Sequence, residues 1–436
     1  MNVRITAGVA GIALAISALP AAAQPATPAA PAARVTSQAQ VGTPFAFSGL
    51  SLSDAEKAAL ANSPDVTAAN AVVNQNSAAL AAVHSALGPQ LVAGYVTSPQ
   101  NGPNGGTILS QITSVGVQTT IGDIAAYSPL VAAAVANLRN AESSRQGVMR
   151  TERMKLVGLY YDALKARAVR DARESALATA NEQLRAAQVR FNAGDAPKLD
   201  VVRANVAVAK STADAELARV ADTNASEALR VETAAPATAF TATTAAVPPT
   251  MTEIDPAVAV TRARVLRPEL AAAQQVTVAA QASARAARRA TLPALTVGAG
   301  YASGIDGGVH VAAPTVNVTM NLPLSGAARA RVSQADAIVA EDQAKAAATA
   351  RAIDVEVAAT ARSLVATRKA TAATTEARRQ AEAQLAATQL GYRNGASSSL
   401  ELSSARDVYT QAVVDELSAF YEEARASAIL SLEVGQ

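Results

Sequence analysis

The stretch that decides the fold is NEQLRAAQVRFNAGDAPKLDVVRANVAVAKSTAD, which begins at Asn181, because the chain contains a second version of it. The counterpart, EAQLAATQLGYRNGASSSLELSSARDVYTQAVVD, aligns with it at a constant offset of 201 residues. Leu184 matches Leu385, and Gly194 matches Gly395. Several matches at one offset indicate an internal duplication of about 200 residues. Solenoid repeats are far shorter, roughly 20 to 50 residues, so each copy is predicted to form half of one architecture.

A second pair of segments recurs in the same order, Asn62 to Ser98 and Leu266 to Ser303. Two prolines repeat in them at an offset of 204 residues, and each segment then runs into a Gly-Tyr pair. The matched positions are Pro64 with Pro268, Pro89 with Pro293, and Gly94-Tyr95 with Gly300-Tyr301. The duplication therefore covers both parts of the repeat.

The first residues have the anatomy of an export signal. The basic residue Arg4 precedes an apolar run from Ile5 to Leu19, and small residues follow before Gln24. This run is shorter than the roughly 20 apolar residues of a membrane-spanning helix, so cleavage after Ala23 is favoured over a membrane anchor. The chain has no cysteine, so the exported protein is expected to have neither disulfides nor a lipidated thiol.

The composition favours long helices over an ordinary globular core. Hydrophobic residues make up 50% of the chain and aromatic residues only 3%. Ala-rich, Leu-dotted sequence with interspersed charges is typical of long helices and coiled coils. The 37 Lys and Arg residues nearly balance the 35 Asp and Glu residues, and the two signs are mixed along the chain. This pattern argues against a nucleic-acid partner.

Each copy is predicted to begin with helices and to continue as a β-hairpin. The first helix is expected from Leu52, with Ser53 and Glu56 as a capping box, and Pro64 opens a second helix. Two stretches rich in β-branched residues then flank a turn dense in Pro, Asn and Gly. They predict a hairpin at about 90–122.

The second hairpin, at about 294–322, shows a stricter alternation. Val316, Val318 and Met320 are separated by polar residues, which gives one apolar and one polar face. In a soluble sheet the apolar face would lie on a core, whereas in an outer-membrane barrel it would face lipid. The pattern leaves both possibilities open.

A long helical hairpin follows the strands in each copy, at about 130–232 and about 324–432. The first long helix, Leu130 to Phe191, would measure on the order of 90 Å at 1.5 Å per residue. Leucines at heptad spacing indicate a coiled-coil seam along it. Four prolines are predicted to mark the crossings between strands and helices: Pro89, Pro129, Pro293 and Pro323.

The predicted organisation has five parts. They are a signal peptide at 1–23, a Pro/Ala-rich segment at 24–51, the first repeat at 52–232, an Ala/Thr/Pro linker at 233–252, and the second repeat at 253–436.

The duplicated order of helix, proline, β-hairpin, Pro-Leu, long helix and Gly turn resembles the TolC-like outer-membrane efflux proteins, the outer membrane factor family. The most specific stretches are FNAGDAPKLDVVRA and YRNGASSSLELSSARD, and the resemblance extends from about Leu52 to Leu432. It implies a mainly α fold with a β-barrel part. Three chains would form an α-helical tunnel and share one 12-stranded outer-membrane barrel. Four strands from one chain cannot close a barrel, and open sheet edges are not tolerated in lipid.

The resemblance also implies a function. The chain would be the outer-membrane exit duct of a tripartite efflux pump or a type I secretion system, with its tunnel extending into the periplasm. Its expected partners are two further copies of itself, a periplasmic adaptor, an inner-membrane transporter and outer-membrane lipid. The adaptor would dock at the helical-hairpin turns, Gly194 with Asp195 and Gly395 with Ala396.

By the same resemblance, the gate at the periplasmic end would use Asp200, Tyr392 and Glu401. Asp200 would link to Tyr392, and a ring of Glu401 carboxylates would attract cations. Ser397 and Ser404 depart from the family pattern, since an arginine and an acidic residue often stand there. A competing interpretation is that Asp200 and Glu401 only cap or solvate the returning helices.

An enzyme is not expected, because the two histidines, His84 and His310, stand alone and no nucleophile motif, metal-ligand spacing or phosphate loop occurs. No cofactor or metal is expected either. The competing function is a periplasmic coiled-coil adaptor or structural protein. It would share the export signal and the helical hairpins, but it gives no reason for two alternating, proline-bounded β-hairpins.

Overall fold

The computed structural model describes residues 51–85, 89–101, 107–234, 255–306, 309–321 and 326–434. The predicted signal peptide, the segment 24–50, nearly all of the predicted linker and Pro323 lie outside the described residues.

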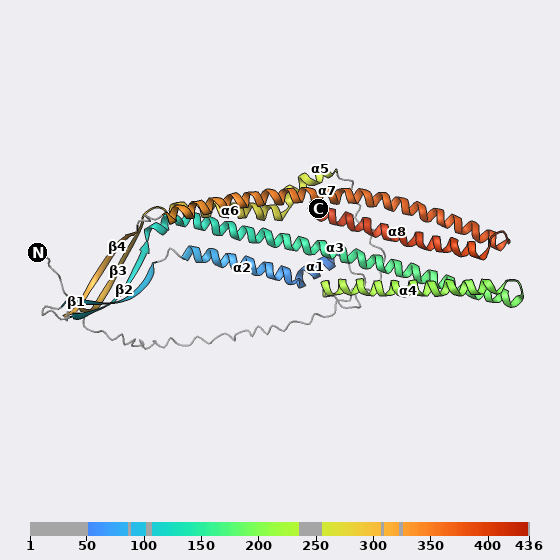
Figure 1. Cartoon of the computed structure of the whole chain (residues 1–436), viewed down its shortest axis with the longest axis horizontal. Helices are drawn as coiled ribbons and strands as arrows, with labels where there is room; N and C mark the ends of the chain where they lie inside the picture. The colour runs from blue at the N-terminus through green and yellow to red at the C-terminus, as the bar shows by residue number, and fades with distance from the viewer. Residues whose placement is uncertain are drawn as a thin grey trace, which may run out of the picture. The chain divides into compact units, whose positions relative to one another are not determined.

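Within the described ranges, the chain forms the same series of elements twice (Figure 1). Each copy has two shorter helices, two antiparallel strands and two long helices. The first copy comprises α1 (Leu52–Asn62), α2 (Pro64–Ser85), β1 (Gln90–Asn101), β2 (Thr107–Thr120), α3 (Ile121–Ala193) and α4 (Lys198–Thr233). The second comprises α5 (Pro256–Leu266), α6 (Pro268–Arg289), β3 (Ala294–Asp306), β4 (Val309–Asn321), α7 (Ala327–Arg393) and α8 (Ser399–Val434).

The prolines mark the element boundaries only in part. Pro89 lies between α2 and β1, and Pro293 lies between α6 and β3, as predicted. The prediction for Pro129 was wrong, because Pro129 lies inside α3 and the change from strand to helix occurs between Thr120 and Ile121. An internal proline lacks the amide hydrogen for one helical bond, but it does not require the helix to begin there.

The predicted cap of the first helix was displaced by two residues. Ser51, not Ser53, is the N-cap, and its Oγ accepts a hydrogen bond from the amide of Asp54 at 3.1 Å. In the second copy Asp255 caps α5 in the same way, by accepting from the amide of Ala257 at 2.9 Å. A short oxygen-bearing side chain satisfies the orphan amides of a first turn, which is why such residues start helices.

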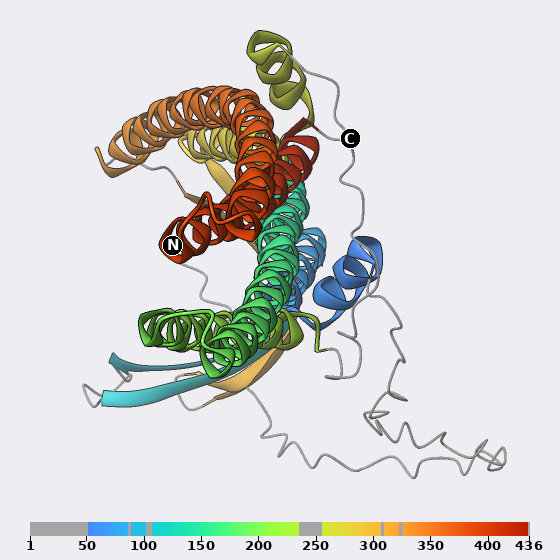
Figure 2. The ribbon, with the colours of Figure 1, turned by 90° about the vertical axis from the view of Figure 1, so that its right-hand side faces the viewer.

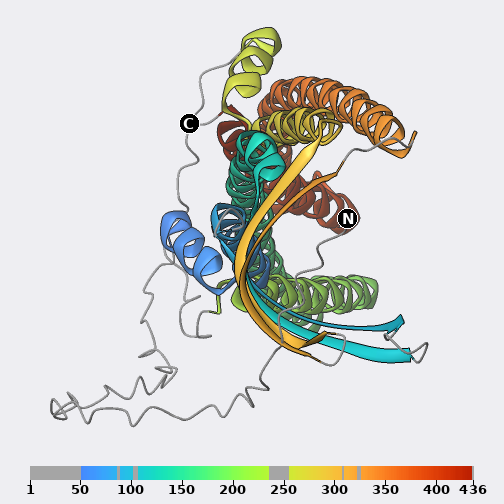
Figure 3. The same ribbon diagram turned by 90° about the vertical axis from the view of Figure 1, so that its left-hand side faces the viewer.

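The four strands form one antiparallel sheet in the order β1-β2-β3-β4, so the central pair joins the two copies (Figure 3). Gly116 of β2 faces Gly300 of β3, where the backbones approach closely. A Cβ on Gly300 would lie 2.6 Å from the carbonyl oxygen of Val115, which explains why glycine occupies this position. The outer strands, β1 and β4, are the edges of the sheet in one chain.

The chain divides into two compact units, each assembled from both copies. The first unit contains Val72–Ala141 and Ala272–Ala346, and therefore the sheet with the adjoining parts of the helices. The second contains Gly42–Ala71, Glu142–Ala271 and Ala347–Gln436. No described helix combines the length and the apolar character needed to cross a membrane.

Two related apolar clusters form the core of the second unit. The first gathers side chains from α1, α3, α4 and α8, and the second gathers side chains from α5, α7 and α8. Leu156 of α3 and Val357 of α7, which are 201 residues apart, are both fully buried. The duplication therefore extends to side-chain packing. The buried members include Ala55, Ala59, Val157, Tyr160, Tyr161 and Leu229 in the first cluster, and Ala259, Ala263, Ile353, Leu364, Leu430 and Val434 in the second.

Candidate functional site

The two helical-hairpin turns have the same backbone geometry. Gly194 directly follows α3 with φ +82°, and Gly395 lies two residues after α7 with φ +74°. The amides of Asp195 and Ala396 each donate to the carbonyl five residues earlier, at 2.9 and 2.7 Å. This bond pattern, with a left-handed residue inside it, ends both helices as a Schellman motif, and only glycine takes such a φ without steric cost. All four residues are exposed at the turns.

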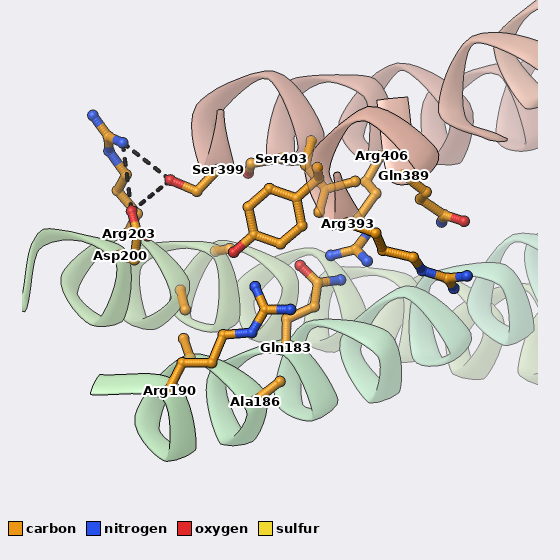
Figure 4. Close-up of a pocket in the computed structure, with 15 residues that line it drawn as sticks. Gln183, Ala186, Arg190, Asp200, Arg203, Gln389, Arg393, Ser399, Ser403 and Arg406 are labelled. Carbon is orange, nitrogen blue, oxygen red and sulfur yellow. Dashed lines mark hydrogen bonds and ion pairs between the residues drawn. The ribbon is translucent and has the colours of Figure 1, made fainter. Parts of the chain in front are cut away.

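Asp200 lies in the first turn of α4, and its side chain contacts the start of α8 in the other copy (Figure 4). Its carboxylate accepts a hydrogen bond from Ser399 Oγ at 2.6 Å and lies 3.7 Å from the Arg203 guanidinium. Arg203 also donates to Ser399 Oγ at 3.1 Å, so the three side chains form a closed set, here called the Asp200 cluster. The Asp200 side chain is only 16% exposed, so water competes weakly for these bonds.

Glu401 occupies the equivalent position in α8 but makes local contacts. Its carboxylate accepts from the backbone amide of Ser398 at 2.8 Å, and its own amide donates to Ser398 Oγ at 3.2 Å. This reciprocal pair is a capping box. The contacts of Glu401 therefore match the helix-capping interpretation, whereas those of Asp200 join the two copies.

One substitution between the copies accounts for this difference. Pro197 precedes α4 at the position where Ser398 precedes α8. Proline has neither an amide hydrogen nor a hydroxyl group, so it can form neither half of a capping box. The start of α4 accordingly has no side-chain cap hydrogen bond. The Asp200 carboxylate is therefore available to bind Ser399.

Tyr392 lies near the Asp200 cluster, but no hydrogen bond joins it to Asp200 among the residues that the structure describes. The guanidinium of Arg190 lies over the Tyr392 ring, 5.1 Å from its centroid, in a cation–π contact between α3 and α7. Tyr392 and Asp200 line the same cavity, and Glu401 does not. The structure therefore brings two of the three predicted gate residues together.

The cavity has a volume of about 260 Å³ and lies between two helix pairs, α3 with α4 and α7 with α8. Figure 2 shows these pairs from the end that carries their turns. Four arginines and one carboxylate contribute charge to the lining: Arg190, Arg203, Arg393, Arg406 and Asp200. These arginines were not predicted from the sequence, because their charges are interspersed with opposite charges along each helix. Ser399 was not predicted either, because only the fold brings it to Asp200.

The two positions that depart from the family pattern have different surroundings. Ser397 is held in the second turn, where its amide donates to the Gly391 carbonyl at 3.1 Å. A Cβ on Gly391 would lie 2.4 Å from Ser397 Oγ, so the two residues fit closely. Ser404 is exposed on α8. Neither serine belongs to the Asp200 cluster.

A buried ion network lies elsewhere in the second unit, at the junction of α5 and α6. Arg267 is 4% exposed and lies 3.2 Å from Glu356 and 3.7 Å from Glu433, which is 2% exposed. Burial raises the pKa of the Glu433 carboxyl, and Arg267 opposes this shift. Arg150 of α3 pairs with Glu269 at 2.5 Å and lies 3.5 Å from Glu356. The network therefore connects the two copies, and it was not predicted from the sequence.

The equivalent place in the first copy uses a different cation. Glu232, which is 201 residues before Glu433, pairs with Lys155 of α3 at 2.8 Å. The neighbouring Glu152 is 5% exposed, and burial together with Glu232 raises the pKa of its carboxyl. Both copies thus retain a glutamate near the end of the returning helix, but the basic partner comes from different elements.

A protein-family model describes the same architecture. The model for outer membrane efflux proteins matches residues 56–234 and 259–436, which is most of the chain and includes both copies. The chain therefore belongs to the outer membrane efflux protein family. It is a transport protein of the outer membrane that functions in efflux, and the family is not one of enzymes.

Solved structures of outer-membrane channels share this fold. A membrane protein from Pseudomonas aeruginosa is 18% identical with a TM-score of 0.77, and the match covers 88% of this chain and 93% of that one. The CmeC outer membrane channel of Campylobacter jejuni is 17% identical with a TM-score of 0.73, covering 88% and 85%. The MtrE outer membrane channel of Neisseria gonorrhoeae, in its open state, is 18% identical with a TM-score of 0.72, covering 90% and 94%. No curated protein sequence matches the chain significantly.

Proposed function

We propose that three copies of this chain form one exit duct, in which the sheets combine into a 12-stranded outer-membrane barrel and the long helices form a tunnel into the periplasm. The observation that carries the proposal is the four-stranded sheet with two unpaired edges. Its strands of 12 to 14 residues are long enough to cross a bilayer, for which roughly 9 to 11 tilted residues suffice. A sheet in lipid must close, and three copies of four strands would close it.

The side chains on the edge strands support a membrane location. Val316, Val318 and Met320 of β4 are 77%, 62% and 58% exposed, so one chain does not cover its own apolar face. Leu91 and Tyr95 of β1, which lie on the same face of the sheet, are also largely exposed. Lipid contact would remove this surface from water, which is favourable by about 25 cal/mol per Å² of apolar area.

The helix α4 also carries an apolar row that one chain leaves uncovered. The exposed residues lie at spacings of three, four and eleven, which place them on one side of a helix. They are Val202, Val206, Leu217, Val220 and Val231. A neighbouring copy in a helical tunnel would cover this row.

Conduction through such a duct would be passive, without any covalent chemistry. An inner-membrane transporter would supply the energy, and a periplasmic adaptor would dock at the exposed turns, Gly194 with Asp195 and Gly395 with Ala396. A partner of the type I secretion class would use the same exit. We further propose that Asp200, Tyr392 and Glu401 form the gate. The contacts of the Asp200 cluster support this role for Asp200, because they join the starts of α4 and α8, which would have to separate on opening.

Disulfide crosslinking tests the proposed assembly, and the natural chain offers a cysteine-free background. Each variant would carry two cysteines. One would replace Leu91 in β1, and the other would be placed at a different position along β4 in each variant. In the shared barrel, β1 of one copy pairs with β4 of the next, so one or two neighbouring combinations should give covalent trimers in outer membranes. Only monomers, or only dimers, across the whole series would overturn the closed barrel.

A further inference from the structure

The lining of the cavity between the helical-hairpin turns is unbalanced in charge. Its four guanidinium groups face one carboxylate, which leaves three formal positive charges in excess. The Asp200 carboxylate is already bound to Ser399 and lies beside Arg203. The excess charge is therefore concentrated on Arg190, Arg393 and Arg406, and Arg190 extends from α3 toward the opposite helix pair (Figure 4).

These three arginines lack anionic partners in the part of the chain that the structure describes. None of them has a carboxylate within ion-pair distance there, and the contact of Arg190 is with the ring of Tyr392. The Nε atom of Arg406 is buried and has no hydrogen-bond partner in that part. Burial also lowers the pKa of Arg406, which reflects the cost of removing its charge from water. A guanidinium remains charged in proteins, so an anion would relieve this cost.

The size and polarity of the cavity suit a small oxyanion. Its volume of about 260 Å³ exceeds the roughly 30 Å³ that one water occupies, so an oxyanion would fit with several waters. Guanidinium groups bind phosphate and carboxylate oxygens through paired N–H donors. Gln183, Gln389 and Ser403 add neutral donors to the same lining.

We propose that this cavity is a binding site for a free oxyanion of the phosphate class, held by Arg190 and Arg406 between the two helix pairs. The bound anion would join α3 to α8 and stabilise the closed arrangement of the turns. The binding site lies within one chain, so it does not depend on the proposed trimeric duct. Its charge also differs from that of the carboxylate ring, which would attract cations.

The test is a titration of the full-length protein in detergent with inorganic phosphate, followed by isothermal calorimetry and by ³¹P line broadening. Saturable binding of one phosphate per chain is expected. Arg190→Gln and Arg406→Gln should each weaken binding by about tenfold or more, since each removes a charged hydrogen-bond donor to the anion. Arg379→Gln, on the exposed face of α7, is the matched control and should bind like the natural protein.

Circular dichroism on each variant separates loss of the site from loss of the fold. A natural protein that binds no phosphate would overturn the proposal. Equal weakening by Arg379→Gln would also overturn it, because the binding would then be a general effect of surface charge. A failed barrel crosslinking experiment would leave this test unaffected, so the two proposals can fail separately.

Discussion

Among single residues, Pro197 and Ser398 decide what two equivalent carboxylates contact. Both Asp200 and Glu401 stand three positions after these residues, in the first turn of a returning helix. The serine provides an amide and a hydroxyl, so Glu401 is held within its own helix. The proline provides neither, so Asp200 reaches Ser399 in the other copy. Proline in place of serine thus changes the contact of the carboxylate three residues later. Instead of capping its own helix, the carboxylate binds a side chain of the other copy.

The first prediction concerns the link itself. Asp200→Ala removes the acceptor for Ser399 and leaves Arg203 without its carboxylate. Loss of a charged hydrogen bond of about 1.5 to 3 kcal/mol should shift a closed–open equilibrium toward opening by about tenfold or more. Larger single-channel conductance or greater drug leakage, with the assembly retained, is expected in planar bilayers and susceptibility assays. Glu182→Ala, on an exposed side chain of α3 outside the turns and the cavity, is the control, and a conductance change equal to that of Asp200→Ala would contradict the assignment.

The second prediction concerns the residue that precedes α4. Pro197→Ser restores an amide and a hydroxyl before α4, so Asp200 should turn back into a capping box. Hydrogen exchange at the first turn of α4 should slow, because an added N-cap stabilises a helix by about 1 kcal/mol. Conductance should increase at the same time, as is expected for Asp200→Ala. Slower exchange with unchanged conductance would show that the link to Ser399 has no role in gating.

Residue-level prediction from sequence succeeded where a local rule acts alone. Gly194 and Gly395 were placed at the turns, because a helix end with positive φ favours glycine. The cap at Ser51 was placed two residues late, since Ser51 and Ser53 both precede acidic residues at the capping distance. Ser399 was missed altogether. Its importance depends on a contact with Asp200, 199 positions away, which only the fold creates.

At the scale of elements, the buried ion network secures the junction of α5 and α6 to α8. Arg267 and Glu433 are both nearly inaccessible to water. Removal of Arg267 would leave the buried Glu433 without its paired cation, whereas removal of Glu433 would still leave Arg267 beside Glu356. Breaking a buried pair in this way typically costs 3 to 5 kcal/mol. Neither residue belongs to a periodic pattern, so heptads and proline spacing could predict the helices but not the polar contacts between them.

The third prediction follows from the raised pKa of the Glu433 carboxyl. Its usual value is 4.5, and burial raises the pKa in the folded protein, so the folded state keeps this proton where the unfolded chain has lost it. The contribution of Glu433 to stability is therefore largest below pH 4.5 and decreases as the pH rises through the folded pKa. The stability of Glu433→Gln should not show this decrease as the pH rises. Thermal denaturation at a series of pH values would measure it. Glu382→Gln, on an exposed side chain, should keep the natural pH profile, and a Glu433→Gln profile that matches it would contradict the prediction.

At the scale of the whole molecule, the duplication explains why so much of the fold could be predicted. The same pattern occurs twice, so each helix and strand could be predicted from two stretches of sequence. The repeated prolines Pro89 and Pro293 do lie at boundaries between a helix and a strand. Pro129 misled because a proline can also lie within a long helix. The pairing of β2 with β3, which makes one sheet from two hairpins, left no signal in the sequence, because register between distant strands depends on tertiary packing.

The central claim is that the two unpaired sheet edges of one chain are closed by two further copies. The most direct test is the mass of the protein extracted from outer membranes in detergent, measured with and without boiling. The account predicts a species of about three times the mass of one mature chain, which is somewhat below the 44.0 kDa of the full sequence, and it predicts dissociation to single chains on heating. A monomer or dimer in the soluble periplasmic fraction would contradict it.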